Sequence, residues 1–208
     1  NSGMADKLAM ILMETPANPT NALIDIAGCK QIAMQYSTIG RKIPVVVDNT
    51  YMGPLWSHPL EHGADLVVYS ATKYIGGHSD VIAGACLGSK ELMTRVRTLR
   101  TFLGNMAGPW TGWLLMRSLE TLKVRMEAQA SGAQVVANFL VNHPKVERVY
   151  YLGFITEEND PWQYEILKKQ YCSNGAMISF DIRGGEKEAF AFLNKVKLFK
   201  LAVSLGST

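Results

Sequence analysis

A short apolar run, Leu66-Val67-Val68, leads into a lysine flanked by hydroxyl residues and glycines, and this stretch constrains the chain most. The run is typical of a buried strand, and Gly76-Gly77 beyond it lets the backbone turn tightly and approach a ligand. Lys73, held where the strand ends, can condense with an aldehyde through its amine. Ser70 and Thr72 alternate before it, so both hydroxyls can face one phosphate. An aldehyde that carries a phosphate indicates pyridoxal 5′-phosphate, PLP.

A second apolar run, Val45-Val46-Val47, ends in the carboxylate of Asp48. The segment from Asp48 to Lys73 is long enough for a strand–helix–strand unit, which places both residues at one edge of a parallel sheet. Open α/β sheets bind their ligands at this edge, beyond the carboxyl ends of the strands. A PLP enzyme also needs an acid against the pyridine nitrogen, because the protonated ring is the better electron sink. Asp48 is therefore the predicted partner of the ring nitrogen.

Three motifs together resemble the Cys/Met-metabolism family of PLP-dependent enzymes: E-T-P-A-N-P-T at residues 14–20, D-N-T-Y at residues 48–51, and S-A-T-K-Y-I-G-G-H-S-D at residues 70–80. The family includes cystathionine γ-lyase, methionine γ-lyase, cystathionine γ-synthase and the homoserine-ester sulfhydrylases. The resemblance covers about residues 10–208. It implies an α/β fold of PLP fold type I, with a mostly parallel sheet and a smaller α+β C-terminal domain.

The pattern of apolar residues indicates that the chain folds as two domains of unequal size. Residues 1–141 are expected to form the PLP-binding large domain, incomplete at its N-terminal side. Residues 142–208 are expected to begin the C-terminal α+β domain, also incomplete. The patterning predicts strands near residues 8–13, 44–50, 66–68, 81–87, 146–152 and 176–182, and helices near residues 25–36, 90–102, 110–119, 121–141, 162–170 and 187–198.

The resemblance also implies roles for individual residues. Lys73 would hold PLP as an internal aldimine and then act as general base and acid, with Asp48 against the ring nitrogen. The hydroxyls of Ser70 and Thr72 would bind the phosphate, and Asn18 would touch the ring or the substrate carboxylate. Further contacts are implied for Ser204, near the lysine and the substrate carboxylate, and for the backbone amides of Gly3 and Met4, in an S-G-M tripeptide of the phosphate site.

The spacing of these motifs departs from the family pattern. Only about ten residues separate Ser2-Gly3-Met4 from the motif at residues 14–20, whereas the family has a much longer stretch there. The residues that would stack on the pyridine ring or bind the substrate carboxylate cannot be assigned in this sequence. We therefore expect the active protein to be about twice this length, and a chain of these residues alone to be a poor enzyme.

The function implied by the resemblance is PLP-dependent γ-elimination on a sulfur amino acid, of the cystathionine or methionine γ-lyase type. One alternative is γ-replacement by a cystathionine γ-synthase or an O-acyl-homoserine sulfhydrylase. Another is a truncated, non-catalytic PLP-fold protein. A nucleotide-binding domain that uses Gly76-Gly77-His78 as its phosphate loop is disfavoured, because the glycine spacing is wrong and the lysine precedes the glycines.

Composition limits the partners. The net charge of +3 is too small to indicate nucleic acid, and no apolar run reaches the ~18 residues of a membrane span. Three scattered cysteines without C-x-x-C spacing are typical of reduced thiols in the cytoplasm. His58 and His62 are four residues apart, but Pro59 and Gly63 interrupt any helix, so no metal site is expected. From the resemblance we expect a homotetramer, a dimer of dimers that share active sites.

Overall fold

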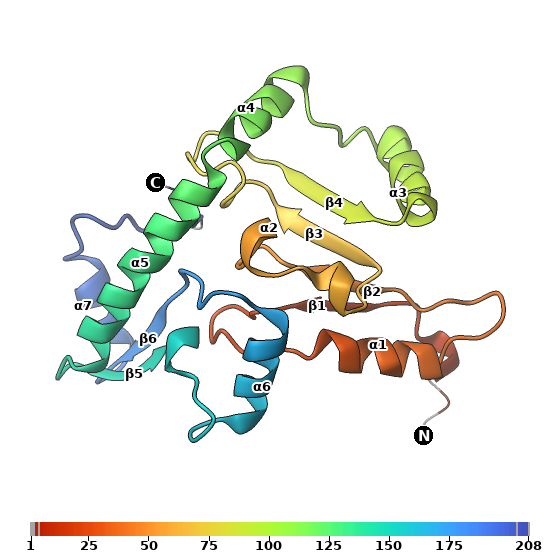
Figure 1. Cartoon of the computed structure of the whole chain (residues 1–208). Coiled ribbons are helices and arrows are strands. Elements are labelled where there is room, and N and C mark those ends of the chain that lie inside the picture. Colours follow the sequence, from red (N-terminus) through yellow and green to blue (C-terminus); the bar gives the residue numbers. More distant parts are fainter. Residues whose placement is uncertain (1–2, 4, 203, 208) are drawn as a thin grey trace.

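The computed structural model describes residue 3, residues 5–202 and residues 204–207 (Figure 1). Their strands form two separate sheets, one of four strands and one of two. In the order of the chain, the elements are η1 (Ala5–Lys7), β1 (Ile11–Glu14), α1 (Ile26–Gln35), β2 (Val45–Asp48), α2 (Gly53–Trp56), η2 (Pro59–His62), β3 (Leu66–Ser70), β4 (Gly84–Gly88), α3 (Lys90–Leu103), α4 (Pro109–Leu119), α5 (Leu122–Val141), β5 (Val146–Tyr150), η3 (Leu152–Phe154), α6 (Pro161–Gln170), β6 (Ser179–Ile182) and α7 (Glu186–Leu193).

The larger sheet carries the predicted site. Its order is β1-β2-β3-β4; β1, β2 and β3 run parallel, and β4 returns antiparallel to β3. The protein is therefore α/β with a mixed sheet. Val45 and Val47 of β2 are fully buried, and they pack with Ile26 of α1 in one hydrophobic cluster. The apolar β2 sequence thus gives a central strand whose carboxyl end is fixed beside that of β3.

The long helix α5 links the two sheets. Figure 1 shows α5 running from the turn region beyond β3 down to the β5–β6 pair. Its buried face contributes Leu122 and Met126 to the cluster around Tyr74, and Ala137 to the cluster around Tyr151. No helix of the described residues is both long and apolar enough to span a bilayer.

The smaller sheet pairs β5 with β6 in antiparallel fashion, and α6 lies between them in the sequence. Asp160 caps α6, because its Oδ1 accepts the Gln163 N–H at 3.1 Å, as the acidic loop before this helix predicts. One hydrophobic cluster joins Leu167 and Tyr171 to Leu23 and Trp56 from the first part of the chain. The division at residue 141 stays a prediction, since α6 shares a hydrophobic cluster with Leu23, Trp56 and Tyr74 from the first 141 residues.

Amide side chains of α6 fasten it to the segment between β1 and α1. Gln163 accepts the Leu23 N–H at 2.6 Å and donates to the Leu23 carbonyl at 2.9 Å. Gln170 accepts the Ile26 N–H at 2.8 Å and donates to the Ile24 carbonyl at 3.0 Å. Each side-chain amide therefore makes the donor and acceptor hydrogen bonds that the backbone of a neighbouring strand would make. These bonds anchor the loop that carries Asn18 where it enters α1.

Two local expectations differ from the structure. The pair Gly53-Pro54 predicts a loop over residues 51–56. Instead, residues 53–56 form the short helix α2, in which Pro54 lies at a first-turn position that suits a ring without an N–H. The helix predicted near residues 187–198 ends at Leu193. The residues after Asn194 are mostly exposed and lysine-rich, so little burial supports further helical turns.

Candidate active site

Asp48 and Ser70 meet at one edge of the larger sheet. Asp48 ends β2 and lies opposite Val68 of β3, so Ser70, the last residue of β3, follows two positions further on. Glu14 at the end of β1 is the neighbour of Asp48 on the other side. The carboxyl ends of three parallel strands therefore gather these side chains, as the alternation of apolar strands and polar ends predicts.

Thr50 connects Asp48 to Ser70. The Asp48 Oδ1 atom accepts the Thr50 N–H at 3.0 Å and the Thr50 hydroxyl at 2.6 Å. The same hydroxyl accepts the Ser70 N–H at 2.8 Å. Among the described residues no donor contacts Asp48 Oδ2 or the Ser70 hydroxyl, so one carboxylate oxygen and one hydroxyl remain for a ligand. The sequence reasoning missed Thr50, although Asp-x-Thr is a pattern in which the carboxylate caps the N–H two residues on.

Lys73 lies in the tight turn beyond β3. Its N–H donates to the Ser70 carbonyl at 3.1 Å, and its own carbonyl accepts the Gly77 N–H at 2.7 Å. Gly77 adopts φ +73°, a left-handed conformation that favours glycine. Lys73 Nζ is 3.3 Å from the Ser204 hydroxyl, which accepts a hydrogen bond from the amine. The structure thus brings together the lysine and the serine that the sequence places 131 residues apart.

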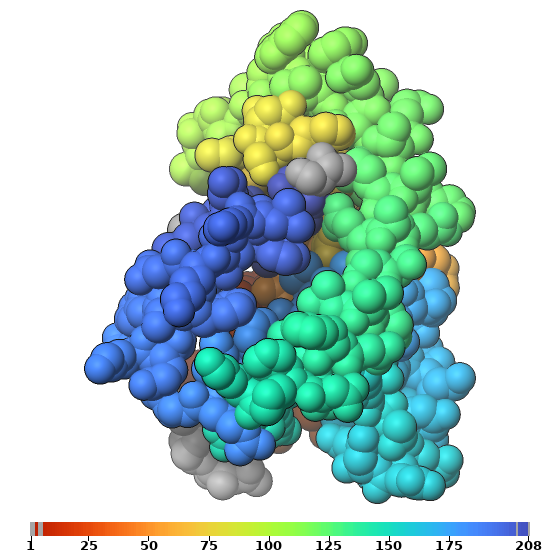
Figure 2. Space-filling view, turned by 90° about the vertical axis from the view of Figure 1, so that its left-hand side faces the viewer, coloured from red at the N-terminus to blue at the C-terminus, as the bar shows by residue number. Residues whose placement is uncertain are grey.

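The segment at residues 204–207 lies against this turn. A Cβ atom added to Gly206 would meet the backbone of Lys73 and Tyr74 at 3.0–3.2 Å, so only a glycine fits without a shift. The carbonyl of Ser207 accepts a hydrogen bond of 3.5 Å from Gln129 of α5. In Figure 2 the blue segment that ends the chain lies next to the yellow segment that follows β3. These contacts hold Ser204 near Lys73.

The Thr72 hydroxyl is engaged by the backbone of Ala83. It accepts the Ala83 N–H at 3.0 Å and donates to the Ala83 carbonyl at 3.3 Å. Thr72 therefore pins the segment before β4 against the lysine turn. A hydroxyl has one proton to donate, so binding a phosphate would require Thr72 to release the longer of these two bonds.

Asn18, Gly3 and Met4 lie apart from these contacts. Asn18 is exposed, in the loop closed by the Ala17–Ala22 bridge. Gly3 is exposed, with nothing within 4 Å of the position of an added Cβ. It precedes β1, and the residue of β1 that neighbours Asp48 is Glu14, at the opposite end of that strand. The structure does not bring Gly3 to the edge with Asp48, and Met4 lies outside the described residues.

Burial shapes the electrostatics around this edge. Burial, with smaller contributions from the carboxylates of Glu14 and Asp48, raises the pKa of Tyr51, so its phenol stays neutral beside them. Burial raises the pKa of Tyr74 still more. The Tyr74 hydroxyl is buried without a hydrogen-bond partner among the described residues. The tyrosines next to the acidic edge and the lysine turn are therefore neutral phenols.

Comparison with known proteins gives the family. The model of the family described as Cys/Met metabolism PLP-dependent enzyme matches residues 1–208. This chain belongs to that family. An L-methionine gamma-lyase of Fusobacterium nucleatum is 41% identical over 210 residues, which is 100% of this chain and 51% of that protein. A cystathionine gamma-lyase of Bacillus subtilis is 43% identical over 198 residues, 95% of this chain and 50% of that protein.

Solved structures agree with the fold. A cystathionine gamma synthase from Xanthomonas oryzae pv. oryzae, in complex with cystathionine, matches with a TM-score of 0.86 and 35% identity, over 96% of this chain and 49% of that one. A methionine gamma lyase from Micromonospora echinospora, solved in the apo form, matches with a TM-score of 0.85 and 36% identity, over 96% of this chain and 52% of that one. The chain therefore spans about half the length of the relatives it matches.

The residues at this edge fit the cofactor of the family, PLP. The Lys73 amine has a neutral hydroxyl as its described partner, which leaves it able to react with an aldehyde. Asp48 offers an oxygen for the ring nitrogen, and the Ser70 hydroxyl is available for a phosphate oxygen. In the part of the chain that the structure describes, no cluster of three or more metal-ligating side chains occurs.

Proposed function

We propose that the complete protein carrying this chain catalyses PLP-dependent γ-elimination on a sulfur amino acid, of the methionine or cystathionine γ-lyase type. The observation that carries the proposal is the meeting of Asp48, Ser70, Lys73 and Ser204 around one sheet edge. The relatives named above as γ-lyases, at 41–43% identity, support this reaction class.

When bound, PLP supplies an electron sink for charge that develops at the substrate α-carbon. Lys73 would hold the cofactor through its amine and, once released from it by the substrate, would move a proton from the α-carbon. Asp48 would keep a proton on the pyridine nitrogen, and Thr50 would orient that carboxylate through its hydroxyl, 2.6 Å away. Ser204 would orient the Lys73 amine, and Ser70 would donate to the phosphate. Removal of a second proton, from the β-carbon, then allows the γ-substituent to leave as a thiol.

Thr72 and Asn18 have supporting roles in the proposal. Thr72 holds the lysine turn against Ala83 and reaches the phosphate only if its 3.3 Å bond to the Ala83 carbonyl opens. Asn18 would approach the ring or substrate from the loop that α6 anchors. Gly3 is not part of this arrangement.

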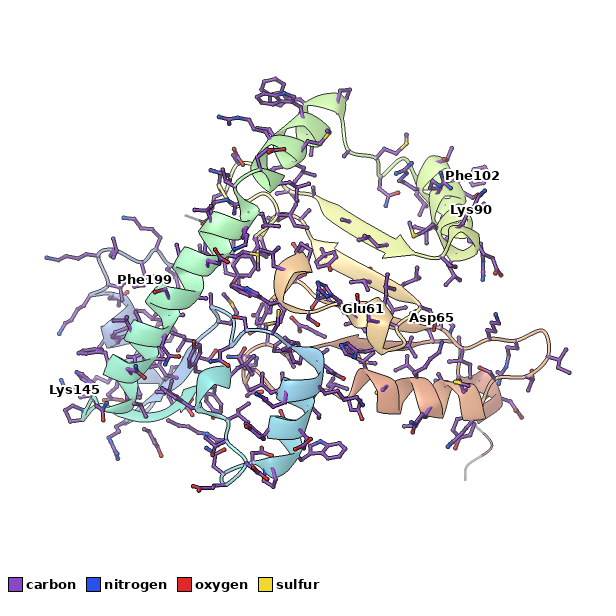
Figure 3. The ribbon with its side chains drawn as sticks, in the orientation of Figure 1. Glu61, Asp65, Lys90, Phe102, Lys145 and Phe199 are labelled. Carbon is purple, nitrogen blue, oxygen red and sulfur yellow. The ribbon has the colours of Figure 1, made fainter. Side chains whose placement is uncertain are left out.

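We also infer a homo-oligomer in the cytoplasm. Large apolar side chains are exposed along α3, α4 and the loop between them: Leu99, Phe102, Leu103, Met106, Trp110 and Trp113. Phe102 is 82% exposed, and Figure 3 shows it on α3 at the rim of the molecule. A surface of this kind suits contact with a second copy, consistent with a dimer of dimers that share active sites. The free thiols Cys29, Cys86 and Cys172 suit a reducing compartment.

The test uses the complete protein and its Lys73→Ala variant. The wild type should show the visible absorbance of lysine-bound PLP and release a 2-oxo acid and a thiol from methionine or cystathionine. Lys73→Ala should keep the far-UV circular dichroism of the wild type but lose that absorbance and all turnover. Borohydride trapping of PLP on Lys73→Ala would contradict the role of Lys73. A thioether product formed from an activated homoserine and a thiol, without elimination, would favour the γ-replacement alternative.

A further inference from the structure

Arg125 of α5 is the one ionised side chain in the buried set of the described residues. In the sequence it stands among charged residues near the start of the helix, together with Lys123 and Glu127. In the structure Arg125 is only 8% exposed, whereas Lys123 and Glu127 pair on the exposed face. The spacing along α5 turns Arg125 towards the core beside Met126, where a charge is costly.

All the hydrogen bonds of Arg125 in the described structure go to neutral oxygens. Its Nε donates to the Thr121 hydroxyl at 3.0 Å, Nη1 to the Tyr74 carbonyl at 2.8 Å and Nη2 to the Ser118 carbonyl at 2.9 Å. None of the ion pairs found among the described residues includes Arg125. Burial accordingly lowers the pKa of Arg125, though an arginine remains charged. Apolar side chains of similar size would fill this space at lower cost, which points to a use other than stability.

The guanidinium lies directly under the lysine turn. Tyr74, whose carbonyl it binds, is the residue after Lys73. A Cβ atom added to Gly77 would fall 2.0 Å from Nη1 and 2.5 Å from Cζ of Arg125, so the backbone of the turn at Gly77 lies in close contact with the guanidinium. The Tyr74 ring, 1% exposed, packs edge-on against Trp56. The turn is therefore fixed both by its own backbone hydrogen bonds and by Arg125.

We propose that Arg125 is a positioning residue that fixes the direction of the Lys73 side chain. It does so by binding the carbonyl of the adjacent residue and by filling the space beneath Gly77. The planar fork binds the Tyr74 carbonyl in the turn and, at the same time, Ser118 and Thr121 at the junction of α4 and α5. It therefore joins the turn to the helices more rigidly than a single point donor would. The inference rests on the proposed function, because the direction of Lys73 matters for holding PLP and for moving the substrate proton.

The experiment compares three variants of the complete protein. Arg125→Met removes the donors with little loss of volume, and Arg125→Lys keeps the charge but not the fork. Lys123→Met is the matched control, because Lys123 lies on the same helix but is exposed and pairs with Glu127. The measurements are the PLP dissociation constant of the apoprotein, the visible circular dichroism of bound PLP, and kcat and KM separately.

Arg125→Met should keep the far-UV spectrum but weaken PLP binding about tenfold, the effect expected when one strong hydrogen bond no longer orients the turn. Its kcat should fall by roughly 10²-fold with KM little changed, because a displaced lysine affects proton transfer more than substrate binding. The visible circular dichroism should shrink, since it reports how rigidly PLP is held. Arg125→Lys should lie between Arg125→Met and the wild type, and Lys123→Met should equal the wild type.

Wild-type PLP affinity, circular dichroism and kcat in Arg125→Met would overturn the inference while leaving the proposed function intact. If Arg125→Met does not fold, Gly77→Ala provides the decision, since its methyl would clash with the guanidinium and its backbone would be strained at φ +73°, both of which displace the turn from Arg125. Unchanged kcat and circular dichroism in both Gly77→Ala and Arg125→Lys would also overturn the inference. A wild-type protein that takes up no PLP would instead refute the proposed function, and this inference with it.

Discussion

Thr50 offers a sharp test of how the candidate site is built. In Thr50→Val the side chain keeps its shape but loses the hydroxyl that joins Asp48 to β3. Two bonds disappear: the 2.6 Å donation to Asp48 Oδ1 and the 2.8 Å acceptance of the Ser70 N–H. Thr50 is 7% exposed, so water cannot freely replace the hydroxyl.

The magnitude follows from these two bonds. A hydrogen bond to a charged group contributes about 1.5–3 kcal/mol, and a buried N–H left without a partner costs about 1–3 kcal/mol. Asp48 is only half-buried, so water recovers part of the first loss. We therefore expect Thr50→Val to lower the free energy of unfolding by about 2–4 kcal/mol. Thr50→Ser keeps the hydroxyl and loses one methyl group, which should cost about 1 kcal/mol.

Urea unfolding of the apo form of the complete protein, followed by far-UV circular dichroism, measures both variants under one condition. Thr50→Val should unfold at clearly lower urea than Thr50→Ser, and it should also bind PLP more weakly because Asp48 loses one of the two hydrogen bonds that orient its carboxylate. If Thr50→Val is as stable as Thr50→Ser to within about 0.5 kcal/mol, the hydroxyl contributes nothing that a methyl group cannot supply, and the reasoning is refuted.

Three further predictions concern the ring acid, the interface of α6 and high pH. Asp48→Asn should keep the fold and bind PLP but lose about 2–4 kcal/mol of transition-state stabilisation, roughly 10²–10³ in kcat; wild-type kinetics with PLP bound would exclude the role. Gln170→Met should lower the free energy of unfolding by about 2–4 kcal/mol, because the buried N–H of Ile26 loses its acceptor; urea unfolding measures this. Burial raises the pKa of Tyr171 to about 12, so the folded state holds this proton more tightly than the unfolded state. Its contribution to stability is complete below about pH 10 and is lost as the pH approaches 12, by about 3 kcal/mol. Tyr171→Phe should therefore lose less stability than the wild type between pH 10 and 12.

The parts of the site that the sequence predicted are those determined by strand periodicity. The apolar runs before Asp48 and Ser70 define strands, and parallel strands bring their carboxyl ends to one edge without further information. The antiparallel direction of β4 could not be predicted from the sequence, because a run of small residues before Gly88 fits either direction of strand pairing. The mixed sheet follows from the tight turn that places Ala83 against Thr72.

The missed features depend on contacts between distant residues. Nothing in the local pattern of α5 distinguishes Arg125 from its exposed neighbours, because its burial depends on the turn at residues 74–77 packing over it. The position of Ser204 beside Lys73 was available only from family resemblance, since no periodicity links residues so far apart. Gly3 was assigned to the phosphate site only because Ser2-Gly3-Met4 matches a tripeptide of the family. In the chain Gly3 precedes the amino end of β1, whereas Asp48 lies beside the carboxyl end of that strand.

The amide hydrogen bonds of α6 also determine when, during synthesis, the segment between β1 and α1 can take its final conformation. The N–H groups of Leu23 and Ile26 take their acceptors from side chains 140 and 144 residues later in the chain. At about 5–20 residues per second, the ribosome needs roughly 7–30 s to supply those glutamines. During that interval the segment after the Asn18 loop has no partner for these groups but water. The loop next to the candidate site can therefore assume its final conformation only after α6 has been synthesised.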